Sequence, residues 1–292
     1  MKIALTGASG SIGSILRNHF KINNDLTLIS LRGKHEEIFK NVEQGTDHLI
    51  HLASLNMLLK SEDDIKAELE ITKKVLEICI RSEIKSLIYF STSQVYDSNA
   101  FKLPRGFSER SSCKPNNNYS LAKLNCENLL IKECKKNDIN LIILRLSPFI
   151  DLKSKTKIAL LGNLAKNMKL SIEFREGDLN SRSFLTKKNL LIAMESTLNY
   201  VNQLTKPCSI TLNLADKSPV STNKIVNIIS ENYSVKPIKI KVPKIFELIT
   251  SKMPVLKGIY ENLTSSHVVD ASLIEQKFEI KLLETSQSIS ND

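Results

Sequence analysis

The chain has 292 residues, 41% of them hydrophobic and 25% charged. This composition is typical of a soluble globular protein and excludes the disordered and fibrous classes. No stretch approaches the roughly 18 consecutive apolar residues of a membrane span, and the first residues lead into a glycine cluster instead of a signal-peptide segment. We therefore expect a cytoplasmic protein that does not insert into a membrane.

Cysteines, histidines and net charge narrow the possible partners. The five cysteines form no C-x-x-C pair and the five histidines are scattered, so we predict neither a metal site nor a disulfide framework. The 41 Lys and Arg residues exceed the 31 Asp and Glu residues, which gives a formal net charge of +10. An anionic partner or a solvated lysine-rich surface would account for this excess. Because the lysines are spread along the chain without interleaved aromatic residues, we expect no nucleic-acid partner.

Short apolar runs alternate with helical patterns in the first half of the chain. The runs are rich in Ile and Leu, as in a parallel sheet covered on both faces, and lie at residues 2–5, 26–31, 48–52, 86–90 and 141–146. The periodic segments between them predict helices over residues 12–20, 63–82 and 119–137. This succession predicts an α/β fold with a doubly wound parallel sheet, the Rossmann arrangement, over residues 1–146.

The pattern is looser in the second half. We expect a strand at residues 209–214 and helices at residues 222–231 and 244–253. Residues 147–292 are expected to form mainly a smaller substrate-binding domain, with residues 189–197 and 209–215 packing back on the Rossmann domain. The active site is then expected in the crevice at the carboxyl ends of the strands.

A glycine-rich turn, Gly7-Ala8-Ser9-Gly10-Ser11-Ile12-Gly13, follows the first predicted strand and opens the first predicted helix. Three glycines at this spacing allow a tight turn, close approach of the backbone to a pyrophosphate, and close packing of the helix on the strand. The helix N-terminus then faces the anion. The motif predicts dinucleotide binding.

The end of the second predicted strand bears on the choice of cofactor. It reads Ile29-Ser30-Leu31-Arg32-Gly33-Lys34 and lacks the carboxylate that would bind the adenosine ribose of NAD. Arg32 is instead suited to the 2′-phosphate of NADP, although a solvated loop charge is the alternative interpretation. We expect NADP(H), with NAD(H) still possible.

A Tyr-x-x-x-Lys pattern opens the predicted helix at residues 119–137. Tyr119 and Lys123 are one turn apart and share a helix face, so the ammonium can favour ionisation of the phenol. Tyr119 is therefore a candidate general acid or base. Hydroxyl side chains also follow the predicted strand at residues 86–90. Thr92, one of them, would hydrogen-bond the substrate oxygen with which Tyr119 exchanges its proton.

The glycine turn, the hydroxyl cluster and the Tyr-x-x-x-Lys pattern, in this order, resemble the extended short-chain dehydrogenase/reductase family, the NAD(P)-dependent epimerase/dehydratases of nucleotide sugars. His51-Leu52-Ala53 resembles the family's H-x-A, Glu109 and Pro115 its E…P segment, and Glu127 its glutamate after the lysine. The resemblance implies that Thr92, Tyr119 and Lys123 are catalytic, with Ser93 as the alternative hydroxyl and a substrate contact. The implied cofactor contacts are Gly7, Ser9, Gly10, Ile12, Gly13, Arg32, Leu52, Ala53, Tyr119 and Lys123.

The C-terminal half resembles the family branch that makes precursors of bacterial surface polysaccharides. The runs concerned are residues 180–190, 212–215, 219–222 and 263–270. Members of this branch are 4-epimerases or 4-keto-reductases of UDP-linked sugars. Arg182 matches an arginine that grips the substrate diphosphate in relatives, a bidentate task suited to a guanidinium.

The sequence also departs from the family pattern. Glu68 stands where relatives usually have Asn, Asp97 replaces a glycine, and residues 147–151 lack a usual Asn. The stretch at residues 31–46 is too short for the usual helix, third strand and following helix, so we expect a shortened adenine pocket without that strand.

The resemblance leaves several functions open. We favour NADP(H)-dependent reduction of a UDP-linked 4-keto sugar, with a NAD-dependent nucleotide-sugar 4-epimerase and a non-catalytic Rossmann binding module as alternatives. A lipid-diphosphate-linked sugar is another conceivable substrate. In many relatives the two long helices, here at residues 63–82 and 119–137, form a four-helix bundle in a homodimer, so a homodimer is possible.

Overall fold

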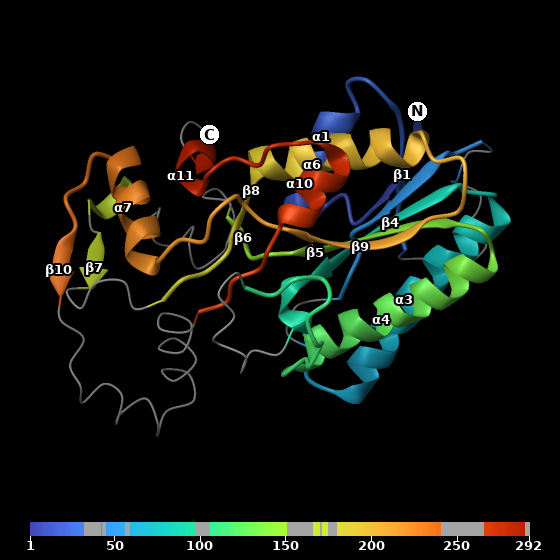
Figure 1. Cartoon of the computed structure of the whole chain (residues 1–292), viewed down its shortest axis with the longest axis horizontal. Coiled ribbons are helices and arrows are strands. Elements are labelled where there is room, and N and C mark those ends of the chain that lie inside the picture. The colour runs from blue at the N-terminus through green and yellow to red at the C-terminus, as the bar shows by residue number, and fades with distance from the viewer. Residues whose placement is uncertain are drawn as a thin grey trace.

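A parallel sheet forms the centre of the protein in the computed structural model (Figure 1). The structure describes residues 1–31, 42, 45–55, 59–96, 106–150, 166–169, 171–174, 180–240 and 266–289. Within these residues the sheet has six strands in the order β2-β1-β3-β4-β5-β9. The strands are β1 (Lys2–Thr6), β2 (Asp25–Ile29), β3 (His48–His51), β4 (Ser86–Thr92), β5 (Asn140–Leu146) and β9 (Ser209–Leu214).

Helices cover both faces of this sheet, which is why its central strands are apolar along their whole length. One face carries α1 (Ser11–Phe20) and α6 (Lys187–Asn202), and the other carries α3 (Glu62–Arg81) and α4 (Asn118–Lys136) (Figure 1). The side chains of successive residues in β4 point to opposite faces of the sheet. Ile88 belongs to the core under α1 and α6, and Leu87 belongs to the core under α3 and α4.

The two long helices begin at capping residues that their sequences supply. Ser61 accepts a hydrogen bond from the backbone N–H of Asp64, whose carboxylate accepts in turn from the N–H of Ser61, a reciprocal cap for α3. Asn117 accepts from the N–H of Ser120 and caps α4. The cap on α4 fixes where its first turn lies, and that turn carries Tyr119.

A smaller part of the chain lies beside the carboxyl ends of the strands (Figure 1). It contains the two-stranded pairs β6–β8 and β10–β7, together with helices α7 and α11. Its elements are β6 (Phe149–Ile150), β7 (Ile172–Phe174), β8 (Leu185–Thr186), α7 (Thr222–Asn232), β10 (Ile238–Ile240) and α11 (Thr285–Ile289). Its own core consists of Ile150, Phe184, Ile225, Ile228, Ile229, Val235 and Ile289.

The C-terminal segment returns to the main sheet. Helix α10 (Ser272–Phe278) packs against α6 and β9, and Val269, Ile274 and Leu282 belong to the core under α1 and α6. This segment therefore packs against the main sheet, in addition to α6 and β9. The domain boundaries themselves stay a prediction.

The predicted doubly wound Rossmann fold is confirmed. Helix and strand ends shift by one or two residues, and β4 continues to Thr92 because Ser91 and Thr92 pair with β5. The helix expected at residues 244–253 lies outside the described residues. So does most of the segment at residues 31–46, and in the part of the chain that the structure describes, β2 is the edge strand beside β1.

No helix among the described residues combines the length and the apolar character that crossing a lipid bilayer would require.

The direction of the sheet's winding changes between β1 and β3, and the backbones meet there without intervening side chains. A Cβ on Gly7, whose φ is +72°, would lie 2.6 Å from the backbone N of Ala53. A Cβ on Gly13 would lie 2.1 Å from the carbonyl oxygen of Gly7. This point between β1 and β3 is where ligands of open α/β sheets bind.

Substitution of Gly13 tests this contact. Gly13→Ala should lower the free energy of unfolding by about 1–3 kcal/mol, because the added methyl group has no room and α1 must shift. Gly10→Ala is the matched control, since its Cβ would stand at 3.4 Å from the nearest atom, and we expect a loss below about 1 kcal/mol. Urea unfolding curves measure both, and equal losses would contradict the contact.

Candidate active site

The N-terminus of α1 is open at the carboxyl end of β1. Gly10 is its N-cap residue and provides no side-chain hydrogen bond. Ser9, Gly10 and Ser11 are exposed. The backbone N–H groups of the first turn can therefore meet an anion directly. These residues fit the pyrophosphate of a dinucleotide, as the glycine spacing predicts.

The segment after β3 is held against β1 by a threonine. Thr6 Oγ1 accepts hydrogen bonds from the backbone N–H groups of Leu52 and Ala53, each at 3.2 Å. It also lies 2.9 Å from Nδ1 of His51, and its own hydrogen is available for that nitrogen. Burial, assisted by the charge of Lys123, lowers the pKa of His51 to about 3, so this imidazole is neutral.

The two residues of the Tyr-x-x-x-Lys pattern lie on the first turns of α4. Tyr119 is half-buried, whereas Lys123 is 3% exposed. The Lys123 ammonium lies 3.2 Å from Oε1 of Glu68 and 5.0 Å from the ring centre of Tyr89. Lys123 is therefore a buried cation with a carboxylate partner on α3.

The hydroxyl cluster lies at the end of β4. Thr92 is the last residue of the strand, and the single turn η1 (Ser93–Val95) follows and packs against α4. Thr92 Oγ1 accepts a hydrogen bond from the backbone N–H of Gln94 at 3.2 Å. Its own hydrogen remains available for another acceptor, and Ser93 is fully buried. The helix of Tyr119 and Lys123 thus packs beside both hydroxyl candidates.

A buried charge network supports this strand end. The Arg145 guanidinium on β5 donates to the carboxylate of Glu127 on α4, with Nη2 at 2.6 Å from Oε2. Ser91 Oγ donates to Oε1 of the same carboxylate at 2.5 Å. Burial opposes the charge of Arg145, but its hydrogen bonds to Glu127 and that residue's charge raise the pKa of the guanidinium. The network ties β4, β5 and α4 together next to Thr92.

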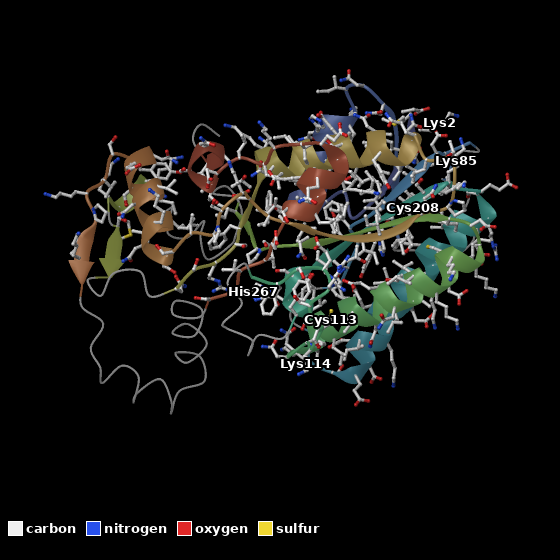
Figure 2. The ribbon with its side chains drawn as sticks, viewed as in Figure 1. Lys2, Lys85, Cys113, Lys114, Cys208 and His267 are labelled. Atoms are coloured by element: carbon white, nitrogen blue, oxygen red, sulfur yellow. The ribbon has the colours of Figure 1, made fainter. Side chains whose placement is uncertain are left out.

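A histidine from the C-terminal segment reaches the same place. His267 Nε2 lies 3.1 Å from the backbone oxygen of Ser93 and 3.2 Å from its Oγ. A carbonyl oxygen only accepts, so Nε2 carries the proton. The His267 ring stands 5.4 Å from that of Phe107. Figure 2 shows His267 at the opposite end of the sheet from Lys2, Lys85 and Cys208.

Arg182 lies beside His267. Their backbones form a bridge, and Arg182 forms a second bridge to Val220. Burial lowers the pKa of the Arg182 guanidinium, and its charge adds to burial in lowering the pKa of His267 to about 4. His267 therefore links two predicted substrate contacts, Ser93 and Arg182. In the sequence, the only signal for His267 is its place within residues 263–270.

The predicted residues thus gather at one end of the sheet with one exception. Arg32, the basis of the preference for NADP(H), lies outside the described residues. Glu109 accepts a hydrogen bond from the backbone N–H of Asn213 at 2.7 Å and so has a structural contact. In the described ranges, no group of three or more His, Cys, Asp or Glu side chains is placed to hold a metal ion.

A family model confirms the resemblance. The model described as the NAD dependent epimerase/dehydratase family matches residues 3–185, which is more than half of the chain, and the chain belongs to this family. The prediction of an enzyme, as opposed to a non-catalytic module, is thereby confirmed. No curated protein matches the chain in sequence.

Solved structures of nucleotide-sugar enzymes share the fold. UDP-N-acetylglucosamine 4-epimerase from Bacillus cereus is 18% identical, with a TM-score of 0.75 over 99% of this chain and 96% of its own. UDP-glucuronic acid 4-epimerase from the same organism, in complex with NAD, is 18% identical, with a TM-score of 0.74 over 99% and 93%. RMD from Pseudomonas aeruginosa, complexed with NADPH, is 16% identical, with a TM-score of 0.74 over 99% and 96%.

The lowered pKa of His267 predicts a pH dependence of stability. In the unfolded chain, His267 gains a proton as the pH falls below 6.5, the ordinary pKa of histidine. In the folded chain, His267 gains this proton only near pH 4. Stability is therefore lost in this window, by at most about 1.4 kcal/mol per pH unit. His267→Gln retains an N–H donor for Ser93 but cannot titrate, so its stability should fall less steeply between these pH values.

Urea unfolding at several pH values measures this difference. His51 contributes in the same direction to both proteins, so its effect cancels in the comparison. Parallel curves for the wild type and His267→Gln would contradict the burial of a neutral imidazole.

Proposed function

We propose that this chain reduces the 4-keto group of a UDP-linked sugar with NADPH, in the synthesis of a surface polysaccharide precursor. The observation that carries the proposal is the packing of α4, with Tyr119 and the buried Lys123, against the hydroxyl-bearing end of β4. When bound, the nicotinamide supplies the hydride for C4. The family of the chain and the open N-terminus of α1 support a dinucleotide at this place.

The protein's own groups divide the remaining work. Tyr119 gives its phenolic proton to the sugar oxygen as the carbonyl is reduced, which is general acid catalysis. Lys123 holds the nicotinamide ribose and favours the phenolate that remains on Tyr119. Thr92 donates its free hydroxyl hydrogen to the same sugar oxygen and orients it. The buried network around Glu127 keeps Thr92 in place.

The substrate's nucleotide end is assigned to the smaller part of the chain. Arg182 is suited to the diphosphate because a guanidinium can bind two oxygens at once. Ser93, fixed by His267, contacts the sugar. Structures with the same fold include MoeE5 in complex with UDP-glucose and NAD, and WbmG from Bordetella bronchiseptica in complex with NAD and UDP. They support a UDP-linked substrate.

Reduction is preferred to epimerisation because of the cofactor it requires. An epimerase returns the hydride to the same sugar and profits from a retained cofactor, commonly NAD held by a carboxylate after the second strand. Here Arg32 and Lys34 follow β2 in place of that carboxylate. A reductase exchanges its cofactor at every turnover, and NADPH is the reduced form suited to this task. The 4-epimerases among the structures that share the fold support the second candidate, a NAD-dependent 4-epimerase.

A homodimer is part of the proposal. Helices α3 and α4 pack side by side on one face of the sheet (Figure 1). Ile80 on α3 and Leu121 and Ile131 on α4 are exposed apolar residues, between 38% and 43% accessible. Contact with the same helices of a second copy would cover them and form a four-helix bundle.

Removal of one oxygen tests the catalytic assignment. Tyr119→Phe should reduce kcat by roughly a hundredfold or more, the contribution of general acid catalysis, and leave NADPH affinity nearly unchanged. Tyr200→Phe is the matched control, because the Tyr200 hydroxyl contacts Cys208 at the opposite end of the sheet, with 3.7 Å between oxygen and sulfur. Turnover of Tyr119→Phe within threefold of wild type would contradict the assignment.

The direction of net chemistry has a separate test. With stoichiometric NADPH and a UDP-4-keto-6-deoxy-N-acetylhexosamine, we expect loss of NADPH absorbance matched by a 4-hydroxyl product in the NMR spectrum. NADH in a parallel reaction should be oxidised more slowly, because Arg32 would have no 2′-phosphate to bind. Interconversion of UDP-gluco and UDP-galacto sugars without added cofactor would instead establish the epimerase.

A further inference from the structure

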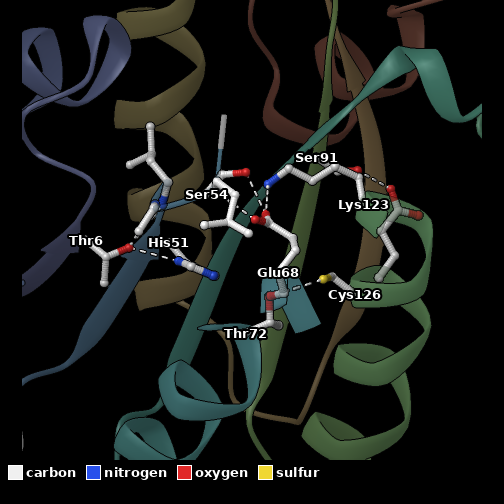
Figure 3. Close-up of polar contacts among 12 residues, drawn as sticks. Thr6, His51, Ser54, Glu68, Thr72, Ser91, Lys123 and Cys126 are labelled. Atoms are coloured by element: carbon white, nitrogen blue, oxygen red, sulfur yellow. Dashed lines mark hydrogen bonds and ion pairs between the residues drawn. The ribbon is translucent and has the colours of Figure 1, made fainter. Parts of the chain in front are cut away.

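Glu68 is a buried carboxylate in the middle of the candidate site. It lies on α3, is 1% exposed, and has polar partners on three sides of its carboxylate (Figure 3). Its Oε1 is 3.2 Å from the Lys123 ammonium and accepts a hydrogen bond from Ser54 Oγ at 2.6 Å. Its Oε2 accepts from the backbone N–H of Leu55 at 2.7 Å. One side chain thus joins α3, α4 and the segment after β3.

Three other titratable groups around Lys123 carry no charge at neutral pH. His51 on β3 is neutral because burial lowers its pKa to about 3. Burial raises the pKa of the Tyr89 phenol on β4 and of the Cys126 thiol on α4. Glu127, four residues after Lys123 on α4, is also an anion, but its carboxylate is paired with Arg145. Glu68 forms the ion pair with Lys123 and provides the counter-charge of the buried ammonium.

We propose that Glu68 is a positioning residue that fixes the Lys123 ammonium, ties it to Ser54 and Leu55, and weakens the positive field that Lys123 exerts on Tyr119. The proposal rests on the proposed function, in which Tyr119 and Lys123 work as a pair. Relatives of the resembled family usually have Asn at this place, and Asn carries no charge. Glu at position 68 therefore adds one full negative charge next to the Lys123 ammonium, compared with Asn.

The charge of Glu68 has an effect because the Glu68–Lys123 pair is buried. Both side chains of the pair are at most 4% exposed, so water screens their fields poorly. With Glu68 ionised, the pair has no net charge, and Tyr119, one helical turn before Lys123, meets a dipole instead of a cation. The phenolate of Tyr119 is then stabilised less than it would be beside an unpaired lysine. Proton donation to a keto oxygen requires the protonated form of Tyr119.

The first experiment titrates Tyr119 in the protein without cofactor. The phenolate absorbance of a protein minus that of its Tyr119→Phe counterpart isolates this one phenol. In Glu68→Gln, which has the shape but not the charge of glutamate, we expect the midpoint to fall by about one pH unit, a tenfold change in the ionisation constant. Glu68→Asp keeps the charge, so its midpoint should stay within about 0.3 units of wild type.

Two further variants secure the interpretation. Glu70→Gln also removes a carboxylate from α3. Glu70 is paired with Lys73 on the surface, where its side chain is 60% exposed to solvent, so the Tyr119 midpoint should not move. Glu68→Asn replaces Glu68→Gln if circular dichroism shows that the latter does not fold, and the same fall is expected. A midpoint in Glu68→Gln or Glu68→Asn that is equal to or above that of wild type overturns the proposal.

The second experiment measures turnover. In the reductive direction, the fall of kcat at high pH should begin about one unit lower in Glu68→Gln than in wild type, whereas Glu70→Gln should match wild type. Failures of the two ideas are distinguishable. If Tyr119→Phe is fully active, the proposed function is wrong, yet the titration still measures the effect of Glu68. If Tyr119→Phe is inactive and neither the midpoint nor the pH profile moves in Glu68→Gln, only the role of Glu68 is wrong.

Discussion

The close approach of three backbone segments around Gly7 is the constraint on which the rest of the structure depends. Strand β1, the first turn of α1 and the segment after β3 meet there with no side chain between them. Thr6 completes the junction by holding the backbone N–H groups of Leu52 and Ala53. This junction sets the direction of α1 and hence where its positively polarised N-terminus points. Gly7 and Gly13 have no Cβ that would push these segments apart. This close approach leaves a place for a pyrophosphate at the N-terminus of α1.

Two buried ion pairs organise the other half of the site. The Glu127 carboxylate on α4 binds Arg145 on β5, and the Glu68 carboxylate on α3 binds Lys123 on α4. Removing such charges from water is costly, so buried pairs add little to stability even when their geometry is good. Each pair instead joins separate elements through hydrogen bonds of defined direction. The outcome is a rigid arrangement of α3, α4, β4 and β5 around Thr92 and Lys123.

The second half of the chain completes the site by returning to it. Asn213 on β9 is the main point of attachment: its Nδ2 donates to the backbone oxygens of Phe107 and Asp270, and its Oδ1 accepts from the Tyr96 hydroxyl at 2.7 Å. His267 adds a contact to Ser93, 174 residues earlier in the chain. Segments far apart in sequence therefore surround the carboxyl ends of the strands, where the family's chemistry is expected.

The sequence by itself determined the fold class and the positions of α1, β4 and α4. Gly7 and Gly13, the apolar runs and the Tyr119–Lys123 spacing are local patterns, and local geometry gives them their meaning. The partners of Glu68 and His267 were decided only by the tertiary structure. Glu68 was a mere departure from a family pattern until packing placed Lys123 beside it. Which buried charges pair depends on how helices and strands pack across the whole domain. The distance between side chains on different elements cannot be predicted from the periodicity of the sequence.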